Sequence, residues 1–269
     1  MSGRAEGFTL VELLVAMALV GTLTAGGLAA YVRASAIWRA QAADQRRYER
    51  AQYVFGTLEP DLQMAGYFGP ARPAALPPSA VPGSVSHCGV DVIARLDRPV
   101  ERLRFLPAAC VPPASMLAGS DILVVRRISA RVAAPRAGRA QWLTAGASSI
   151  EGAVLWDGQL PADAERPELR DLIVRLYYVS RGADGDPRTP ALRVKTLTEV
   201  AGAPYFIDTE VMPGVESLEV QLQPPPAARS VRVALRIRAD AGDADTADAG
   251  RTVSYTRHFS LRNALPDAN

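Results

Sequence analysis

A continuous apolar run extends from Phe8 to Val32, and Glu12 is its only charged residue. An α-helix of this length measures about 37 Å, which is enough to cross a bilayer with about 30 Å of hydrocarbon. The run is too long for the core of a secretory signal peptide, and its polar leader, Met1 to Gly7, is very short. The pattern therefore predicts a membrane-spanning helix over residues 8–32.

A second pattern follows, in which apolar or neutral side chains recur every three or four residues and so share one helix face. These positions are Tyr31, Ala34, Trp38, Gln41, Gln45, Tyr48, Gln52, Phe55, Leu58 and Leu62. We expect an amphipathic continuation of the first helix over residues 33–66. Gly56 and Pro60 should kink or break this helix. Gly66 and Gly69 should end it.

Beyond the helix, the pattern changes from helical to alternating. Residues 70–90 are rich in Pro, Ser, Gly and Ala and should form a loop. Strands are predicted over residues 101–106, 121–133, 141–145, 153–157, 171–181, 191–200, 205–211, 216–223, 230–240 and 251–262. In residues 231–238 apolar side chains alternate with Arg and Ala, which is typical of a sheet with one solvent-exposed face.

Ten short strands without a second helical region predict an α+β fold. In this fold a long N-terminal helix, whose first half spans the membrane, packs on a mainly antiparallel β-sheet head over residues 67–269. Composition changes the picture little, because 30 basic and 28 acidic residues leave a net charge of +2. This balance favours neither an acidic nor a basic partner, and we expect no nucleic acid to bind.

The chain has two cysteines, Cys88 and Cys110. If the head lies outside the cytoplasm, a single disulfide between them is the natural interpretation. The alternative is two unpaired, buried thiols.

Glu12 is the residue that an ordinary membrane anchor does not explain. A carboxylate inside a membrane helix costs at least about 2.5 kcal/mol on insertion scales. No cation follows it within two helical turns. If the chain is cut after Gly7, the new amine on Phe8 is a positive charge near the same depth. Glu12 of one subunit would then meet the Phe8 amine of a neighbouring subunit during assembly.

The segment Gly7-Phe8-Thr9-Leu10-Val11-Glu12 resembles the prepilin motif of type IV pilins and type II secretion pseudopilins. The resemblance implies that residues 1–7 are a leader, which prepilin peptidase removes between Gly7 and Phe8. It further implies N-methylation of Phe8 and a role of Glu12 in assembly. The alternative is a plain single-pass anchor with a chance glutamate.

The orientation of the chain in the membrane is predicted from the resemblance as well as from the charges that flank the span. The leader has Arg4 and Glu6, whereas the span is followed by arginines, so the positive-inside rule alone would put the head in the cytoplasm; these arginines include Arg33, Arg39, Arg46 and Arg47. A prepilin leader must face the cytoplasmic peptidase, which favours the opposite orientation. We therefore expect a single-pass inner-membrane protein with a periplasmic head, which moves to the pilus at the cell surface after assembly.

A further resemblance concerns subtype. The segment from Asp61 to Gly69 is similar to the helix-end segment of PilW-type minor pilins, and residues 211–218 and 260–263 fit the same family. This implies a minor pilin of type IV pilus biogenesis and twitching motility, acting in the initiating or tip complex. Its partners would be other minor pilins, the major pilin, prepilin peptidase, the inner-membrane assembly platform and a tip adhesin. The alternatives are a type II secretion pseudopilin, or a pilus-displayed adhesin or DNA-binding module.

The sequence offers no motif for catalysis, a cofactor or a metal, so we expect no enzyme. His87 and His258 lie far from any acidic or cysteine motif and are interpreted as a loop residue and a strand-surface residue. An acidic loop at residues 240–248 lacks EF-hand spacing and is interpreted as a solvated hairpin loop rather than a calcium site. Arginines that could contact DNA phosphates are interpreted as an ordinary polar sheet face. They are Arg126, Arg127, Arg131, Arg136 and Arg139.

Overall fold

The structure is a computed structural model that describes most of the chain. The described residues are 9–71, 73–111, 115–144, 152–162, 166–184, 186, 188–224, 229–238 and 252–263. The chain divides into two compact units, residues 1–46 with 240–250, and residues 47–239 with 251–269. The second unit is the head, and the fold is α+β, with one long helix followed by a mainly antiparallel sheet structure.

Helix α1 (Leu10–Met64) runs without interruption through both Gly56 and Pro60. The prediction that the helix breaks there is therefore wrong. A proline at position 60 removes the backbone hydrogen bond to the Gly56 carbonyl, one turn earlier. Both residues are exposed, so water can bind that carbonyl. Leu58 and Leu62, on the other side of the same turns, are fully buried and hold the last turns of α1 against the head.

The chain turns sharply after α1 at Gly66, whose φ of +78° is a conformation that favours glycine. A Cβ atom at this position would collide with the backbone carbonyl of Asn263, near the other end of the described chain. The Asn263 side chain donates a hydrogen bond to the Gln63 carbonyl at 3.3 Å, and the Gly66 N–H donates to the Arg126 carbonyl at 3.1 Å. The end of the helix is thus fixed by segments far away in sequence.

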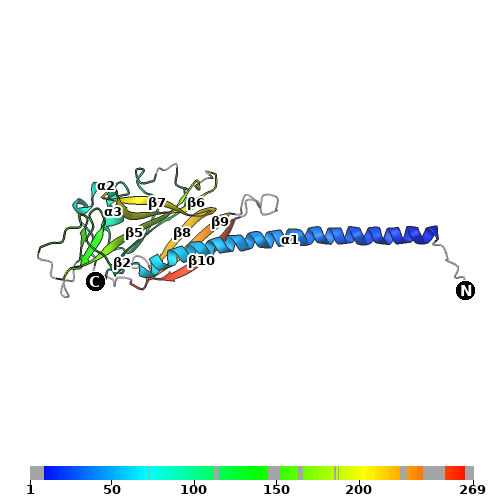
Figure 1. The fold of residues 1–269 in the computed structure, drawn as a ribbon, viewed down its shortest axis with the longest axis horizontal. Helices are drawn as coiled ribbons and strands as arrows, with labels where there is room; N and C mark the ends of the chain where they lie inside the picture. Colours follow the sequence, from blue (N-terminus) through cyan, green and yellow to red (C-terminus); the bar gives the residue numbers. More distant parts are fainter. Residues whose placement is uncertain are drawn as a thin grey trace. The chain divides into compact units, whose positions relative to one another are not determined.

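A seven-stranded antiparallel sheet forms the centre of the head (Figure 1). Its strands are β1 (Val100–Leu103), β2 (Ile122–Val132), β3 (Gln141–Thr144), β4 (Gly152–Leu155), β5 (Glu168–Ser180), β6 (Ala191–Val200) and β7 (Ala203–Pro213). Strand β2 pairs along one edge of β5. The other edge is divided, because β3 pairs with residues 168–171 and β6 with residues 175–180. The sheet therefore branches at β5, and β7 follows β6.

A three-stranded antiparallel sheet in the order β10-β9-β8 completes the head. Its strands are β8 (Val215–Gln223), β9 (Ser230–Arg238) and β10 (Thr252–Ser260). In β9, Val231, Val233 and Ile237 are fully buried, whereas Arg236 and Arg238 are exposed. The predicted alternation is confirmed, and each predicted strand region overlaps one of these strands.

The seven-stranded sheet is covered on both faces, because successive side chains of β2 enter two different cores. Leu123 and Val125 pack with the end of α1 and with the three-stranded sheet. Figure 1 shows this end of α1, in cyan, beside β8, β9 and β10. Ile122 and Val124 point the other way and pack with the segment between α1 and β1.

Residues 70–90 of that segment were expected to form a loop, but they include the short helices η1 (Pro78–Ala80) and α2 (Gly83–Ser86), and α3 (Val90–Ala94) follows. Proline stands at or directly before the start of η1 and α2, where its fixed φ suits a helical turn. Val85 and Ile93 are fully buried against the sheet. Such short turns depend on tertiary packing, and they leave too few residues for a helical period to be visible in the sequence.

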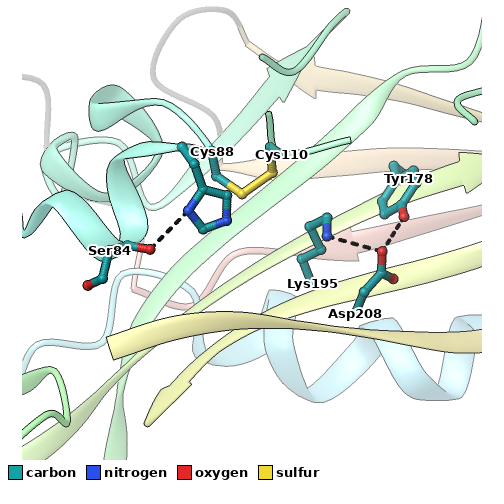
Figure 2. Close-up of a disulfide and its surroundings, with 7 residues drawn as sticks. Ser84, Cys88, Cys110, Tyr178, Lys195 and Asp208 are labelled. Atoms are coloured by element: carbon teal, nitrogen blue, oxygen red, sulfur yellow. Dashed lines mark hydrogen bonds and ion pairs between the residues drawn. A yellow bond between two sulfur atoms is a disulfide. The ribbon is translucent and has the colours of Figure 1, made fainter. Parts of the chain in front are cut away.

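Cys88 and Cys110 form a disulfide, with an S–S distance of 1.98 Å, which joins the turn between α2 and α3 to the loop after β1 (Figure 2). Both cysteines are buried in the same core as Val85 and Ile93. Beside the disulfide, His87 stacks on Tyr205 of β7 with ring centroids 5.4 Å apart. The disulfide thus links two of the segments that cover this face of the sheet.

Candidate functional site

The first described residues form a capping box at the start of α1. The backbone N–H and the side-chain hydroxyl of Thr9 each donate a hydrogen bond to Oε2 of Glu12, both at 2.9 Å. The backbone N–H of Glu12 donates in return to Oγ1 of Thr9 at 3.3 Å. This reciprocal pair satisfies N–H groups that have no partner within the helix, and it places a carboxylate at the positive end of the helix dipole.

Glu12 therefore has two hydrogen-bond donors within its own subunit. The spacing Thr-x-x-Glu before an apolar run is a helix-start signal, and it would have identified Thr9 as a partner of Glu12 from the sequence, where only a cation was considered. Both residues follow the Gly7–Phe8 junction. Cleavage there would leave the capping box intact.

The surface of α1 from Leu10 to Val32 is apolar on every side apart from Glu12, and beyond Arg33 the apolar side chains Ile37 and Trp38 follow. Its large side chains are all more than half exposed in the isolated chain. They are Leu10, Val11, Leu13, Leu14, Val15, Met17, Leu19, Val20, Leu23, Leu28, Tyr31, Val32, Ile37 and Trp38. A helix that is apolar all round is stable when lipid or other protein surrounds it. By length and composition, α1 is the one helix among the described residues that can cross a membrane.

The hydroxyl side chains in this part of α1 bond to the helix itself. The hydroxyls of Thr22, Thr24 and Ser35 donate to the carbonyls of Leu19, Val20 and Val32, at 2.7–2.9 Å. Such bonds leave no hydroxyl donor without a partner, as an apolar surrounding requires.

A comparison with protein families agrees with this geometry. Residues 3–28 match the family model described as the prokaryotic N-terminal methylation motif. The N-terminus of this chain is of the prepilin type. The match supports the class of type IV pilins and pseudopilins, which are structural proteins, and it implies processing by prepilin peptidase and assembly with other pilins. Searches of curated proteins and of solved structures return no match.

The prepilin-type N-terminus is continuous with a helix whose other end is held in the head by Asp61. This carboxylate is 1% exposed. Its Oδ1 accepts hydrogen bonds from Arg127 of β2, at 2.9 and 3.2 Å. Its Oδ2 accepts one from Arg175 at 2.8 Å and one from the Tyr177 hydroxyl at 2.6 Å, both on β5. We call these four residues the Asp61 clamp.

The Asp61 clamp joins the last turn of α1 to two neighbouring strands of the large sheet. Burial, together with the charge and hydrogen bond of Asp61, raises the pKa of Tyr177 well above its ordinary value. The phenol therefore stays protonated and remains a donor to Asp61. A buried carboxylate with two guanidinium partners is stable only while all the partners are in place.

The arginines that the sequence offered as DNA contacts do not form one surface. Arg126 is fully buried and donates to the carbonyls of Val92 and Arg98 and to Glu101, at 2.6–2.8 Å. Its neighbour Arg127 points to the opposite face of the sheet, into the Asp61 clamp. Both side chains therefore form hydrogen bonds within the head and do not belong to a shared outer surface.

The other predicted positions are distributed as follows. Gly7 and Phe8 lie outside the described residues, so cleavage and methylation stay predictions, and the acidic loop 240–248 lies outside them too. His87 ends α2, and His258 is exposed on β10. Within the ranges that the structure describes, no three His, Cys, Asp or Glu side chains group in a way that could hold a metal ion.

Proposed function

We propose that this chain is a minor pilin of type IV pilus biogenesis, which acts in the initiating or tip complex. In this proposal it waits in the inner membrane with its head in the periplasm and assembles through α1 after its leader is removed. The observation that carries the proposal is a capped helix start followed by an apolar surface on all sides, within a prepilin-type N-terminus.

The proposed assembly contact joins Glu12 of one subunit to the methylated Phe8 amine of a neighbour. At an effective dielectric constant of about 20, opposite charges 4 Å apart attract by about 4 kcal/mol before desolvation. The Thr9 donors supply hydrogen bonds to Glu12 while the subunit is alone in the membrane. They also hold the carboxylate at the N-terminal end of α1, which is where a Phe8 amine would lie.

Support for the minor pilin subtype comes from the segment Asp61–Gly69. This segment resembles the helix-end segment of PilW-type minor pilins. It also fixes the end of α1 in the head, because it includes Asp61 of the Asp61 clamp and the turn at Gly66. A type II secretion pseudopilin would use the same N-terminal mechanism and is the alternative.

Processing is tested by mass spectrometry of the membrane-extracted protein from cells with an active prepilin peptidase. The expected species starts at Phe8 and carries one N-methyl group. A protein that still starts at Met1 or Ser2 in these cells would contradict the proposed cleavage. A chain with Gly7→Val should stay uncleaved and serves as the reference for the unprocessed mass.

Assembly is tested with Glu12→Val. The variant should insert into the membrane at least as well as the wild type, because the span loses its only charge. It should be depleted from sheared filaments relative to membranes, and it should restore a deletion strain poorly. Thr24→Val is the matched control, since it also removes a polar group of the span. Normal incorporation of the Glu12→Val protein into filaments would contradict the proposed contact.

The same deletion strain separates the two filament systems. Loss of twitching motility with normal secretion of extracellular enzymes is expected for a type IV minor pilin. The opposite result would identify a pseudopilin. Both measurements are made on the strain complemented with the wild-type chain as well.

A further inference from the structure

A grid of polar side chains lies on β5, β6 and β7, on the sheet face that the disulfide segment covers. The strand register places Tyr178, Arg193 and Glu210 in one cross-strand row, and Lys195 and Asp208 in the next. Lys195 is the only lysine of the chain. Charged groups are rare at such positions, because an internal sheet face normally holds apolar residues.

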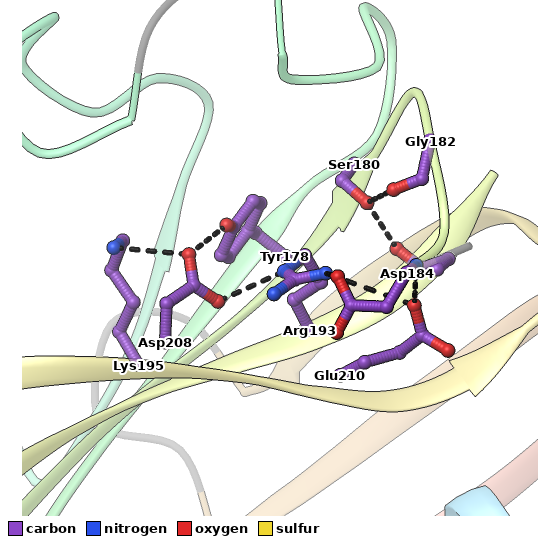
Figure 3. A network of polar contacts seen from close by, with 9 residues as sticks. Tyr178, Ser180, Gly182, Asp184, Arg193, Lys195, Asp208 and Glu210 are labelled. Atoms are coloured by element: carbon purple, nitrogen blue, oxygen red, sulfur yellow. Dashed lines mark hydrogen bonds and ion pairs between the residues drawn. The ribbon is translucent and has the colours of Figure 1, made fainter. Parts of the chain in front are cut away.

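Asp208 is the centre of this grid (Figure 3). Its Oδ2 accepts the Tyr178 hydroxyl at 2.6 Å and lies 3.1 Å from the Lys195 ammonium, while its Oδ1 accepts the Arg193 guanidinium at 3.0 Å. Burial by itself opposes ionisation of Asp208, but these donors outweigh it and keep the pKa of Asp208 below its ordinary value. The carboxylate is therefore charged at neutral pH, and its partners are held in place.

Arg193 extends the grid outward to Asp184, whose Oδ1 it reaches at 2.8 Å. The Asp184 side chain is 70% exposed, and its Oδ2 has no hydrogen-bond partner among the described residues. Arg181 uses only its Nε, which donates to the Met116 carbonyl at 3.2 Å. Its two terminal nitrogens have no hydrogen-bond acceptor in the part of the chain that the structure describes.

A cavity of about 420 Å³ opens over this grid. Its floor is Tyr178, Arg193 and Asp208, and one wall is Cys110, which the disulfide fixes in place. The free groups of Arg181 and Asp184 lie at its rim, together with the exposed Ser115. The volume falls in the range of about 300–1,000 Å³ of small-molecule sites.

The geometry points to this cavity as a binding site for a neutral, polyhydroxylated ligand of the size of a mono- or disaccharide. Among the described residues, two arginines and two aspartates line the cavity, so their charges cancel and neither an anion nor a cation is favoured. The free rim groups include a donor, Arg181, and an acceptor, Asp184, three residues apart in sequence, which suits neighbouring hydroxyls that both donate and accept. A pre-organised polar floor would supply orientation at little entropic cost.

This inference goes beyond the proposed assembly function and does not depend on it. The test uses the full chain in a zwitterionic detergent without a sugar headgroup. Saturation-transfer NMR is recorded with an equimolar mixture of glucose, galactose, mannose, N-acetylglucosamine and N-acetylgalactosamine. We expect saturation transfer to at least one of these sugars. Arg181→Ala and Asp184→Ala should each weaken that binding about tenfold or more, as expected for loss of a hydrogen bond to a charged group.

Arg188→Ala and Asp157→Ala are the matched controls, because both residues are exposed and neither lines the cavity. They should leave binding unchanged. Near-UV circular dichroism checks that each variant is folded, and if Asp184→Ala fails this check, Arg181→Ala carries the test. N-acetylneuraminic acid and glucosamine, which bear a negative and a positive charge, are measured in parallel. No transfer to any neutral sugar, transfer to the charged sugars alone, or equal binding by the wild type and both rim variants would overturn the inference.

Discussion

Helix α1 carries large apolar side chains both in its first part, from Leu10 to Trp38, and in its last turns, from Ala51 to Met64. In the first part they are exposed on every side, whereas in the last turns Val54, Leu58 and Leu62 are fully buried in the head. The two stretches belong to one helix but have different sources of stability. The last turns gain theirs from packing within the subunit, and the first part needs lipid or neighbouring subunits to cover it.

This difference separates two kinds of mutational effect. Changes in the last turns of α1 should alter the stability of the head, because their contacts are all within the subunit. Changes near Thr9 and Glu12 should alter membrane behaviour and assembly while the head stays folded. The following predictions test this separation, beginning with the largest effect.

Asp61→Ala should destabilise the head by about 3–5 kcal/mol, because it removes a buried carboxylate to which Arg127, Arg175 and the buried Tyr177 hydroxyl all donate. Chemical denaturation of the full chain in detergent, followed by near-UV circular dichroism, measures this loss. Glu59→Ala is the control from the preceding turn. Glu59 pairs with Arg257 at 3.2 Å in a partly exposed position, so its loss should cost under about 1 kcal/mol. Equal losses for the two variants would refute the clamp.

The double variant Cys88→Ala, Cys110→Ala should lose about 3 kcal/mol of stability, since the disulfide closes a segment of 22 residues. Thermal unfolding with and without a reductant checks this value. The reductant should lower the melting temperature of the wild type and leave the double variant unaffected. Two freely alkylated thiols in the untreated wild type would contradict the prediction.

Thr9→Val should remove the capping box and weaken the first turn of α1 by about 1 kcal/mol. We expect its share in sheared filaments to fall between those of the wild type and Glu12→Val, with an unchanged melting temperature of the head. Thr24→Val, whose hydroxyl bonds only to the Val20 carbonyl, is the control. Wild-type incorporation of Thr9→Val would mean that the capping box has no part in assembly.

The smallest effect concerns pH. Asp208 has a lowered pKa in the folded state, so it stabilises the head above the ordinary aspartate pKa of about 4, and this contribution is lost as pH falls through the lower, folded value. Because Asp208 is partly exposed, the contribution should be at most about 1 kcal/mol. The stability difference between wild type and Asp208→Asn should be constant from pH 7 to 5 and shrink below pH 4. A difference that grows on acidification would reverse the assigned sign.

Local patterns predicted the long helix and the strands well, because apolar alternation and turn residues act over a few positions. They could not predict the Asp61 clamp, because its bonds join residues that are 66, 114 and 116 positions apart. The branching of the large sheet at β5 was equally hidden, since it depends on which strands share an edge. Such pairings are set by tertiary packing.

Arg126 and Arg127 show the same limit at the level of single residues. Two adjacent arginines in a strand indicate a solvated surface when only one face of the sheet is assumed to be covered. In this head both faces are covered, and each arginine has an acidic partner on its own side, Glu101 for Arg126 and Asp61 for Arg127. The Thr9–Glu12 capping box, in contrast, lies within four residues and was visible in the sequence all along.

The hydrogen bond from Asn263 to Gln63 has a consequence for the order of folding. It joins residues 200 positions apart, at the point where the chain turns after α1. Closing so long a loop is entropically costly, and contacts of this kind form late. During synthesis the end of α1 is made 200 residues before the Asn263 side chain that bonds to it. A chain truncated after residue 260 would keep all the strands of the described head but lack the Asn263 bond to the Gln63 carbonyl, so the end of α1 would be held less firmly.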